Sequence, residues 1–140
     1  MGGINVSRWL LGGLVAGAVI WLMEGAASKL YMDQMQEAME ARGLSMDMGA
    51  GVWMTSVLVG VIVGLGLVFF YAACRPRFGP GPRTAIMVAV AMFVVGYLVS
   101  LLGYQMLGLF PNDLLVKWGA LGLIETIIAS LAGGWVYREA

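Results

Sequence analysis

Two long stretches of this chain contain no charged residue, and they restrict its fold more than any other feature. One lies between Asp47 and Arg75, and the other lies between Arg83 and Asp113. The hydrocarbon core of a bilayer is roughly 30 Å thick, and an α-helix of about 20 apolar residues crosses it. Each stretch is therefore predicted to form a transmembrane helix.

Two further apolar stretches, one near each end of the chain, are each interrupted by a single acidic residue, Glu24 in the first and Glu125 in the second. Of the 140 residues, 61% are hydrophobic and 11% are charged, which is too little polar surface for a soluble domain. We predict an all-α membrane protein whose single domain, residues 1–140, is a four-helix transmembrane bundle. The predicted helices cover about 8–32, 51–74, 84–108 and 114–137.

The basic residues fall mainly on one side of this predicted bundle. An even number of spans places the N-terminus, the loop at 75–83 and the C-terminus on the same side. That side holds Arg8, Arg75, Arg77, Arg83 and Arg138, five of the eight basic residues. Because basic loops stay on the cytoplasmic side, we expect both termini in the cytoplasm and the loop at 33–50 outside the cell.

The predicted cytoplasmic loop, 75–83, combines arginines with the turn formers proline and glycine. It is expected to form a tight turn between the second and third helices. Arg75, Arg77 and Arg83 are predicted to contact lipid phosphates. A phosphate-bearing ligand would use similar groups, but the loop contains no nucleotide-binding motif.

The external loop begins with a helix-favouring segment that carries a stripe of methionines. Met32, Met35 and Met39 are spaced by three and four residues, which predicts an amphipathic helical extension on the membrane surface or against a partner. Together with Met46 and Met48 they offer thioether sulfur, a soft ligand that suits Cu(I). The alternative is that these flexible apolar side chains coat a surface, which the chain's lack of histidine favours.

Small residues recur at four-residue spacing along three of the predicted helices. Because lipid gives helices no hydrophobic reason to associate, membrane helices pack where small residues let their backbones approach. The pattern predicts a tight bundle, a homo-oligomer, or both. The pairs are Gly13 with Gly17, Gly60 with Gly64, and Ala129 with Gly133.

The two acidic residues inside predicted spans are the sharpest candidates for function. A charge at the bilayer centre costs about 3 kcal/mol on insertion scales, so such residues usually face a bundle interior or water. Glu24 and Glu125 both lie on the small-residue faces of their helices, with Ser28 and Thr126 as candidate hydrogen-bond partners. They are interpreted as neutral groups that fix helix register, as a shared proton or cation site, or as ligands of a lipid or cofactor.

Four segments of the sequence carry a family resemblance. They are Glu24 after the first apolar run, YAACRPRFGPGP at 71–82, GLFP at 108–111 and LAGGWVYRE at 131–139. Together they resemble a group of small, uncharacterised four-helix bacterial membrane proteins, most specifically in the arginine–proline run. The resemblance implies an integral protein of the bacterial inner membrane and implies no activity.

The side-chain inventory excludes several classes of function. The chain has no histidine, one cysteine and a net charge of +0, so we expect no disulfide, imidazole metal site or nucleic-acid partner. Without the usual general base, we predict no catalytic residue, no cofactor and no enzyme. The favoured function is a non-enzymatic accessory or structural subunit of a homo-oligomer or larger membrane complex. The alternative is a small proton- or cation-coupled transporter or channel that uses Glu24 and Glu125.

Overall fold

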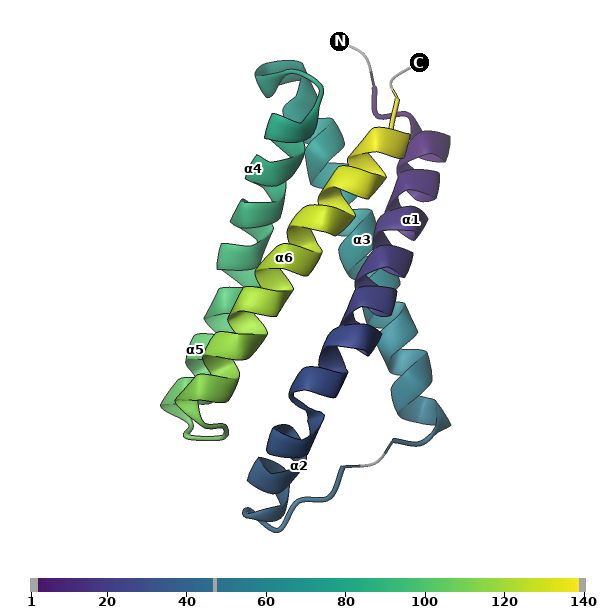
Figure 1. Ribbon diagram of the computed structural model, residues 1–140. Helices are drawn as coiled ribbons and strands as arrows, with labels where there is room; N and C mark the ends of the chain where they lie inside the picture. The colour runs from purple at the N-terminus through teal and green to yellow at the C-terminus, as the bar shows by residue number, and fades with distance from the viewer. Residues whose placement is uncertain (1–2, 47, 139–140) are drawn as a thin grey trace.

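The computed structural model describes residues 3–46 and 48–138 (Figure 1). These residues form helices and connecting segments, and none of them belongs to a strand. Four helical spans are long and apolar enough to cross a membrane, which confirms the predicted all-α, four-helix membrane protein. They are Val6–Leu30, Ala50–Phe78, Pro82–Met106 and Asn112–Val136.

The first span ends earlier than the sequence predicts. Helix α1 (Val6–Ala27) has Asn5 as its N-cap, and the Asn5 side chain accepts a hydrogen bond from the Arg8 N–H at 3.1 Å. A short 3₁₀ turn, η1 (Ser28–Leu30), then leads to Tyr31, whose φ of −138° interrupts the helix. The predicted extension is thus a separate helix, α2 (Met32–Glu40), which we call the arm.

The second span runs further than predicted. Helix α3 (Ala50–Phe78) includes Pro76 and carries Arg75 and Arg77 in its last turn, where basic groups suit the negative end of the helix dipole. Arg83 lies in the first turn of α4 (Pro82–Met92). The predicted nine-residue loop at 75–83 is therefore wrong in its bounds, since the connection between the helices is only 79–81.

The third span changes helical pitch in the middle. Helix α4 continues into a π-helical segment, η2 (Phe93–Leu98), and then into α5 (Val99–Met106). A turn containing Gly108, at φ +62°, leads into α6 (Asn112–Val136). π-Helical turns inside α-helices are rare and often mark functional sites.

The helices converge at one end of the bundle, where α1 begins and α6 ends; we call this the terminal end (Figure 1). Here α1 packs against α3 backbone to backbone. A Cβ placed on Gly17 would lie 2.7 Å from the carbonyl oxygen of Gly60, and one placed on Gly13 would lie 2.8 Å from the Cα of Leu65. The contact is possible only because these positions lack side chains.

Helix α6 packs against α1 beside this contact and also meets α3, because Val68 of α3 lies next to both Gly12 and Gly133. A Cβ on Gly12 would lie 2.8 Å from the carbonyl oxygen of Gly133, and the nearby Ala16 and Ala129 have no exposed surface. In addition, the buried Ser130 hydroxyl donates a 2.8 Å hydrogen bond to the carbonyl of Ala85 and ties α6 to α4. All of these contacts lie inside one chain.

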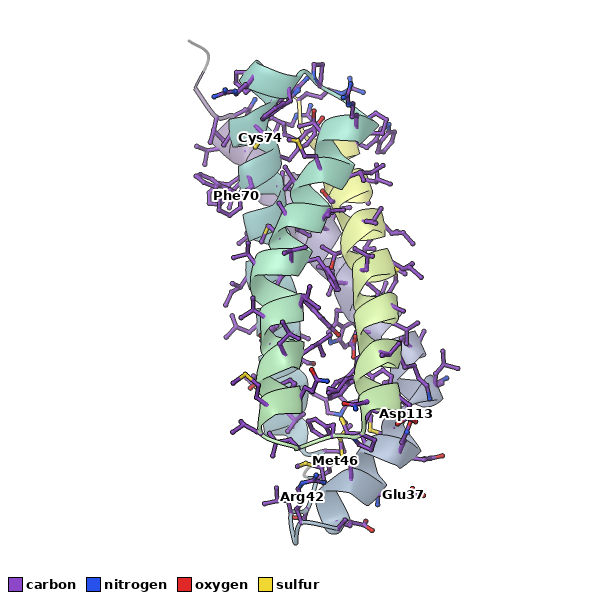
Figure 2. The ribbon with its side chains drawn as sticks, turned by 90° about the vertical axis from the view of Figure 1, so that its left-hand side faces the viewer. Glu37, Arg42, Met46, Phe70, Cys74 and Asp113 are labelled. Atoms are coloured by element: carbon purple, nitrogen blue, oxygen red, sulfur yellow. The ribbon has the colours of Figure 1, made fainter. Side chains whose placement is uncertain are left out.

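The opposite end, which we call the arm end, is held by polar contacts between the arm and the α5–α6 region. Gln34 donates to the carboxylate of Asp113, and the Lys117 ammonium donates to the Gln34 side chain at 3.2 Å. The Arg42 guanidinium donates to the backbone carbonyl of Gly108. Figure 2 shows Arg42, Met46 and Asp113 together at this end, far from Cys74 at the terminal end.

Candidate functional site

The paired geometry of α1 and α6 brings the two intramembrane carboxyl groups together. Both helices are fixed to each other at Gly12 and Gly133, and they run in opposite directions (Figure 1). Glu24 and Glu125 lie on the arm side of this contact, one on each helix. Both residues line the same cavity. We call them the carboxyl pair.

The pair is poorly supplied with hydrogen bonds. Glu24 accepts one from the hydroxyl of Tyr31, the residue at which the first span is interrupted. Glu125 is 5% exposed, and its Oε1 is buried without a hydroxyl, amide or backbone N–H of the described residues to donate to it.

The carboxyl pair lines a cavity of about 570 Å³ at the centre of the bundle. All four spans contribute to its walls, and among the described residues no lysine or arginine lines it. Besides the pair, most of the lining is apolar or aromatic. The aromatic residues in the walls are Phe93, Tyr97, Tyr104 and Trp118.

The π-helical segment supplies two of the aromatic walls. Phe93 and Tyr97 stack with their ring centroids 5.4 Å apart and an interplanar angle of 19°. The Tyr97 ring lies directly over α6, because a Cβ on Gly122 would come within 2.6 Å of it. Tyr97 is also close enough to interact electrostatically with both members of the carboxyl pair.

A second aromatic wall is formed by a cluster of rings at the arm end. Trp118 on α6 packs edge-on against Tyr31 at a centroid distance of 5.5 Å and against Phe110 at 5.1 Å. Tyr104 on α5 lies 6.3 Å from the Trp118 centroid. Tyr31 and Trp118 therefore connect the arm, the carboxyl pair and the cavity.

Sequence reasoning did not select Tyr31 or Trp118 as site residues, although their spacing holds a signal. Tyr31 follows Glu24 by seven residues and Trp118 precedes Glu125 by seven, so each aromatic lies two helical turns from its carboxyl on the same face. This shared face is the sequence signal that could have pointed to the two aromatic residues. The predicted hydroxyl partners take other roles.

Ser28 and Thr126 both donate to the backbone of their own helices. The Ser28 hydroxyl donates to the carbonyl of Gly25 at 2.9 Å, and Ser28 is not among the residues that line the cavity. Thr126 lines the cavity, but its hydroxyl donates to the carbonyl of Gly122 at 2.6 Å. Neither hydroxyl is therefore the partner of the pair, whereas the Tyr31 hydroxyl donates to Glu24.

The other predicted site residues lie away from the cavity. At the terminal end the Arg75 guanidinium stacks 5.6 Å above the ring of Tyr137, and that of Arg77 lies 5.9 Å from the ring of Phe78. The predicted lipid-phosphate contacts of Arg75, Arg77 and Arg83 remain a prediction.

The methionines of the predicted copper site belong to the arm and the segment after it. Met32, Met35 and Met39 lie on α2, and Met35 packs against the apolar cluster around Tyr31 and Leu114. This packing matches the apolar-surface interpretation of Met35. Binding of Cu(I) to the methionines stays untested.

The titratable carboxyl groups in the cavity lining are those of Glu24 and Glu125. Across the described residues, no three histidine, cysteine, aspartate or glutamate side chains are grouped as a metal site would require. Comparison with known protein families, with curated proteins and with solved structures finds no match for this chain. The cavity and its carboxyl pair are therefore the basis on which a function can be proposed.

Proposed function

We propose that this multi-pass membrane protein is a small carrier that binds a cation at the Glu24–Glu125 pair in competition with a proton. The observation that carries the proposal is that two carboxyl groups, from two different spans, line one cavity that no cationic side chain of the described residues lines. A purely structural carboxyl would be expected to use all of its hydrogen-bonding capacity. Glu125 leaves Oε1 buried and without a donor instead.

Charge balance explains why proton and cation would compete. In an apolar surrounding, a site with no net charge is strongly favoured over a charged one. The empty pair is neutral when both carboxyl groups are protonated. The occupied pair is neutral when it holds one proton and one monovalent cation, so each monovalent cation that binds releases one proton to solvent.

The location of the protein forms part of the proposal. The excess of basic residues at the terminal end supports an orientation with both termini in the cytoplasm, and the family resemblance supports a bacterial inner membrane. In that orientation the aromatic cluster around Trp118 lies in the outer half of the bundle. The arm then lies at the outer surface.

One argument for the accessory-subunit hypothesis loses its support, although the hypothesis itself is not tested. That hypothesis relied on small-residue faces, which could serve either the bundle or a partner. Gly13 and Gly17 contact α3, and Gly60 and Gly64 contact α1, all within one chain. These four glycines are therefore already used inside the bundle, and a homo-oligomer or a complex with other subunits would need different surfaces.

Proton release on cation binding tests the proposed function. The purified protein in lipid nanodiscs, in a weakly buffered solution with a pH-sensitive dye, would receive Na⁺, K⁺, guanidinium or tetraphenylphosphonium in turn. We expect at least one of these cations to release protons saturably. Glu24→Gln and Glu125→Gln should each abolish the release, because an amide cannot exchange a proton for a cation.

A matched control separates this effect from general loss of acidic charge. Glu37→Gln removes an exposed carboxylate on the arm, away from the cavity, and should leave the release unchanged. If the native protein releases no protons with any cation of the panel, or if all three variants behave alike, the proposed function is wrong.

A further inference from the structure

We propose that the ligand of the cavity is an organic monocation with an apolar, preferably aromatic body, which enters from the bilayer. The proposal rests on the proposed function above and names the class of cation that the carboxyl pair accepts. Four observations support it: the size of the cavity, its aromatic walls, its opening toward lipid, and the charge that the pair can hold.

The cavity is too large and too apolar for a bare metal ion. Its volume of about 570 Å³ falls within the range of about 300–1,000 Å³ typical of pockets for drug-sized molecules. Ca²⁺ and Mg²⁺ take about six or more oxygen ligands, which walls made of Val63, Met92 and Leu101 do not supply. An organic cation would fill the volume and bring its own apolar surface.

Aromatic side chains surround the carboxyl pair on several sides. Aromatic faces attract cations, and the attraction reaches about 2 kcal/mol where water is excluded. Phe93 and Tyr97 form a stacked wall on one side, and Tyr104 and Trp118 form a second wall toward the arm end. An ammonium or phosphonium group at the pair would place its substituents against these rings.

The cavity reaches the outer surface of the bundle between α3 and α5. Val59 on α3 is 52% exposed and Tyr104 on α5 is 38% exposed, and both residues also line the cavity. Each belongs to a membrane span, so the opening faces lipid. A lipophilic cation partitions into the bilayer and can enter there, whereas a hydrated inorganic ion is excluded from the hydrocarbon.

The exchange of one proton for one cation also sets the pH dependence. Facing the pair are Tyr31 from the α1–α2 junction, Tyr97 from η2 and Tyr104 from α5, while α3 contributes only apolar residues to the walls. With one proton released per cation, acidification by one unit weakens cation binding by up to about tenfold.

The experiment measures binding of tetraphenylphosphonium to the full chain in lipid nanodiscs, with empty nanodiscs as the background. Proton release is recorded in the same samples, and the neutral isostere tetraphenylmethane and Na⁺ are run beside it. We expect saturable binding of the phosphonium with proton release, weakening on acidification, and no saturable binding of the neutral isostere. Glu24→Gln and Glu125→Gln should lose the saturable component.

Variants of the aromatic wall give the more specific test. Trp118→Leu should weaken phosphonium binding about 30-fold, the loss expected for one desolvated cation–π contact of about 2 kcal/mol. Trp135→Leu is the matched control, because Trp135 lies on the same helix, is 79% exposed and does not line the cavity. If Trp118→Leu fails to fold, Tyr104→Leu changes a more exposed wall residue and should weaken binding in the same direction.

The outcomes separate the two proposals. If Na⁺ or K⁺ releases protons through the pair while tetraphenylphosphonium does not bind, the organic-cation inference is wrong and the proposed function stands. If no cation releases protons, both are wrong. Equal binding of the neutral isostere, or equal loss in Trp118→Leu and Trp135→Leu, would also overturn the inference, since neither result requires a cation site with aromatic walls.

Discussion

At the scale of single residues, glycines fix the geometry of this bundle as much as the larger residues do, because they let helix backbones touch. Gly17 lets α1 approach the backbone of α3 at Gly60, and Gly12 lets α1 approach the backbone of α6 at Gly133. These contacts determine where Glu24 and Glu125 meet. Substitution of a glycine at these helix contacts is therefore expected to affect both the stability of the bundle and the geometry of the site.

We predict that Gly17→Ala destabilises the bundle by about 1–3 kcal/mol, since the added Cβ would lie 2.7 Å from a backbone oxygen that cannot move alone. Thermal unfolding in a mild detergent measures the change. Gly25→Ala is the control on the same helix, because nothing lies within 4 Å of its added Cβ. Equal midpoints for the two variants would show that the close contact is absent in the membrane.

The site was partly predictable at this scale. Glu24 and Glu125 stand out because charged residues are rare in apolar spans, and their small-residue faces predicted a common interior. Tyr31 and Trp118 could not be selected on the same ground, since aromatic residues near helix ends usually lie at the membrane interface. Only the packing of the arm end brings these rings toward the carboxyl pair.

At the scale of helices, the apolar stretches predicted each span to within a few residues, because bilayer thickness sets their length. Local backbone features were harder to predict. Helix α3 continues through Pro76, which lies so close to the helix end that it interrupts little of the remaining hydrogen bonding. The interruption at Tyr31 and the π-helical pitch of η2 depend on tertiary packing and have no comparable sequence signal.

The turn between α3 and α4 gives a prediction at this scale. Gly81 has φ of +119° and ψ of −175°, a conformation that costs other residues about 1–3 kcal/mol. Its N–H also donates to the Tyr71 hydroxyl at 3.0 Å. We expect Gly81→Ala to lower the unfolding free energy by that amount in detergent-solubilised protein.

Gly51→Ala is the comparison for this turn, because Gly51 lies in the first turn of α3 with open space around it. Alanine favours helix over glycine by about 1 kcal/mol, so this change should be neutral or stabilising. If Gly81→Ala lowers the unfolding free energy no more than Gly51→Ala does, the tight connection between α3 and α4 is wrong.

At the scale of the whole molecule, the arrangement is asymmetric from end to end. The terminal end is closed by backbone contacts between glycines, while the arm end is held by side-chain hydrogen bonds and an aromatic cluster around a cavity (Figure 1). Such polar contacts at a surface are individually weak and exchange readily with water. We expect the arm end to be the part that opens when a ligand enters or leaves.

Orientation in the membrane is a prediction about the whole molecule that cysteine labelling can test. In a Cys74→Ala background, Ser45→Cys places a thiol in the exposed segment after the arm, and Ser7→Cys places one at the exposed start of α1. A membrane-impermeant thiol reagent added to intact cells should label only the Ser45→Cys protein. Labelling of Ser7→Cys before permeabilisation would reverse the predicted orientation.

The π-helical pitch of η2 has a consequence in genetic terms. A π turn corresponds to an α-helix with one inserted residue, so deletion of one codon within Phe93–Leu98 would restore the ordinary pitch. Residues beyond the deletion would keep nearly the same orientation relative to α4, because a π turn fits one more residue into about the same rotation. Ser100 and Tyr104 would stay in the cavity wall, while the stacked pair Phe93 and Tyr97, which belongs to the π segment, would be rearranged. A change of three nucleotides could thus alter one wall of the cavity and leave the others in place.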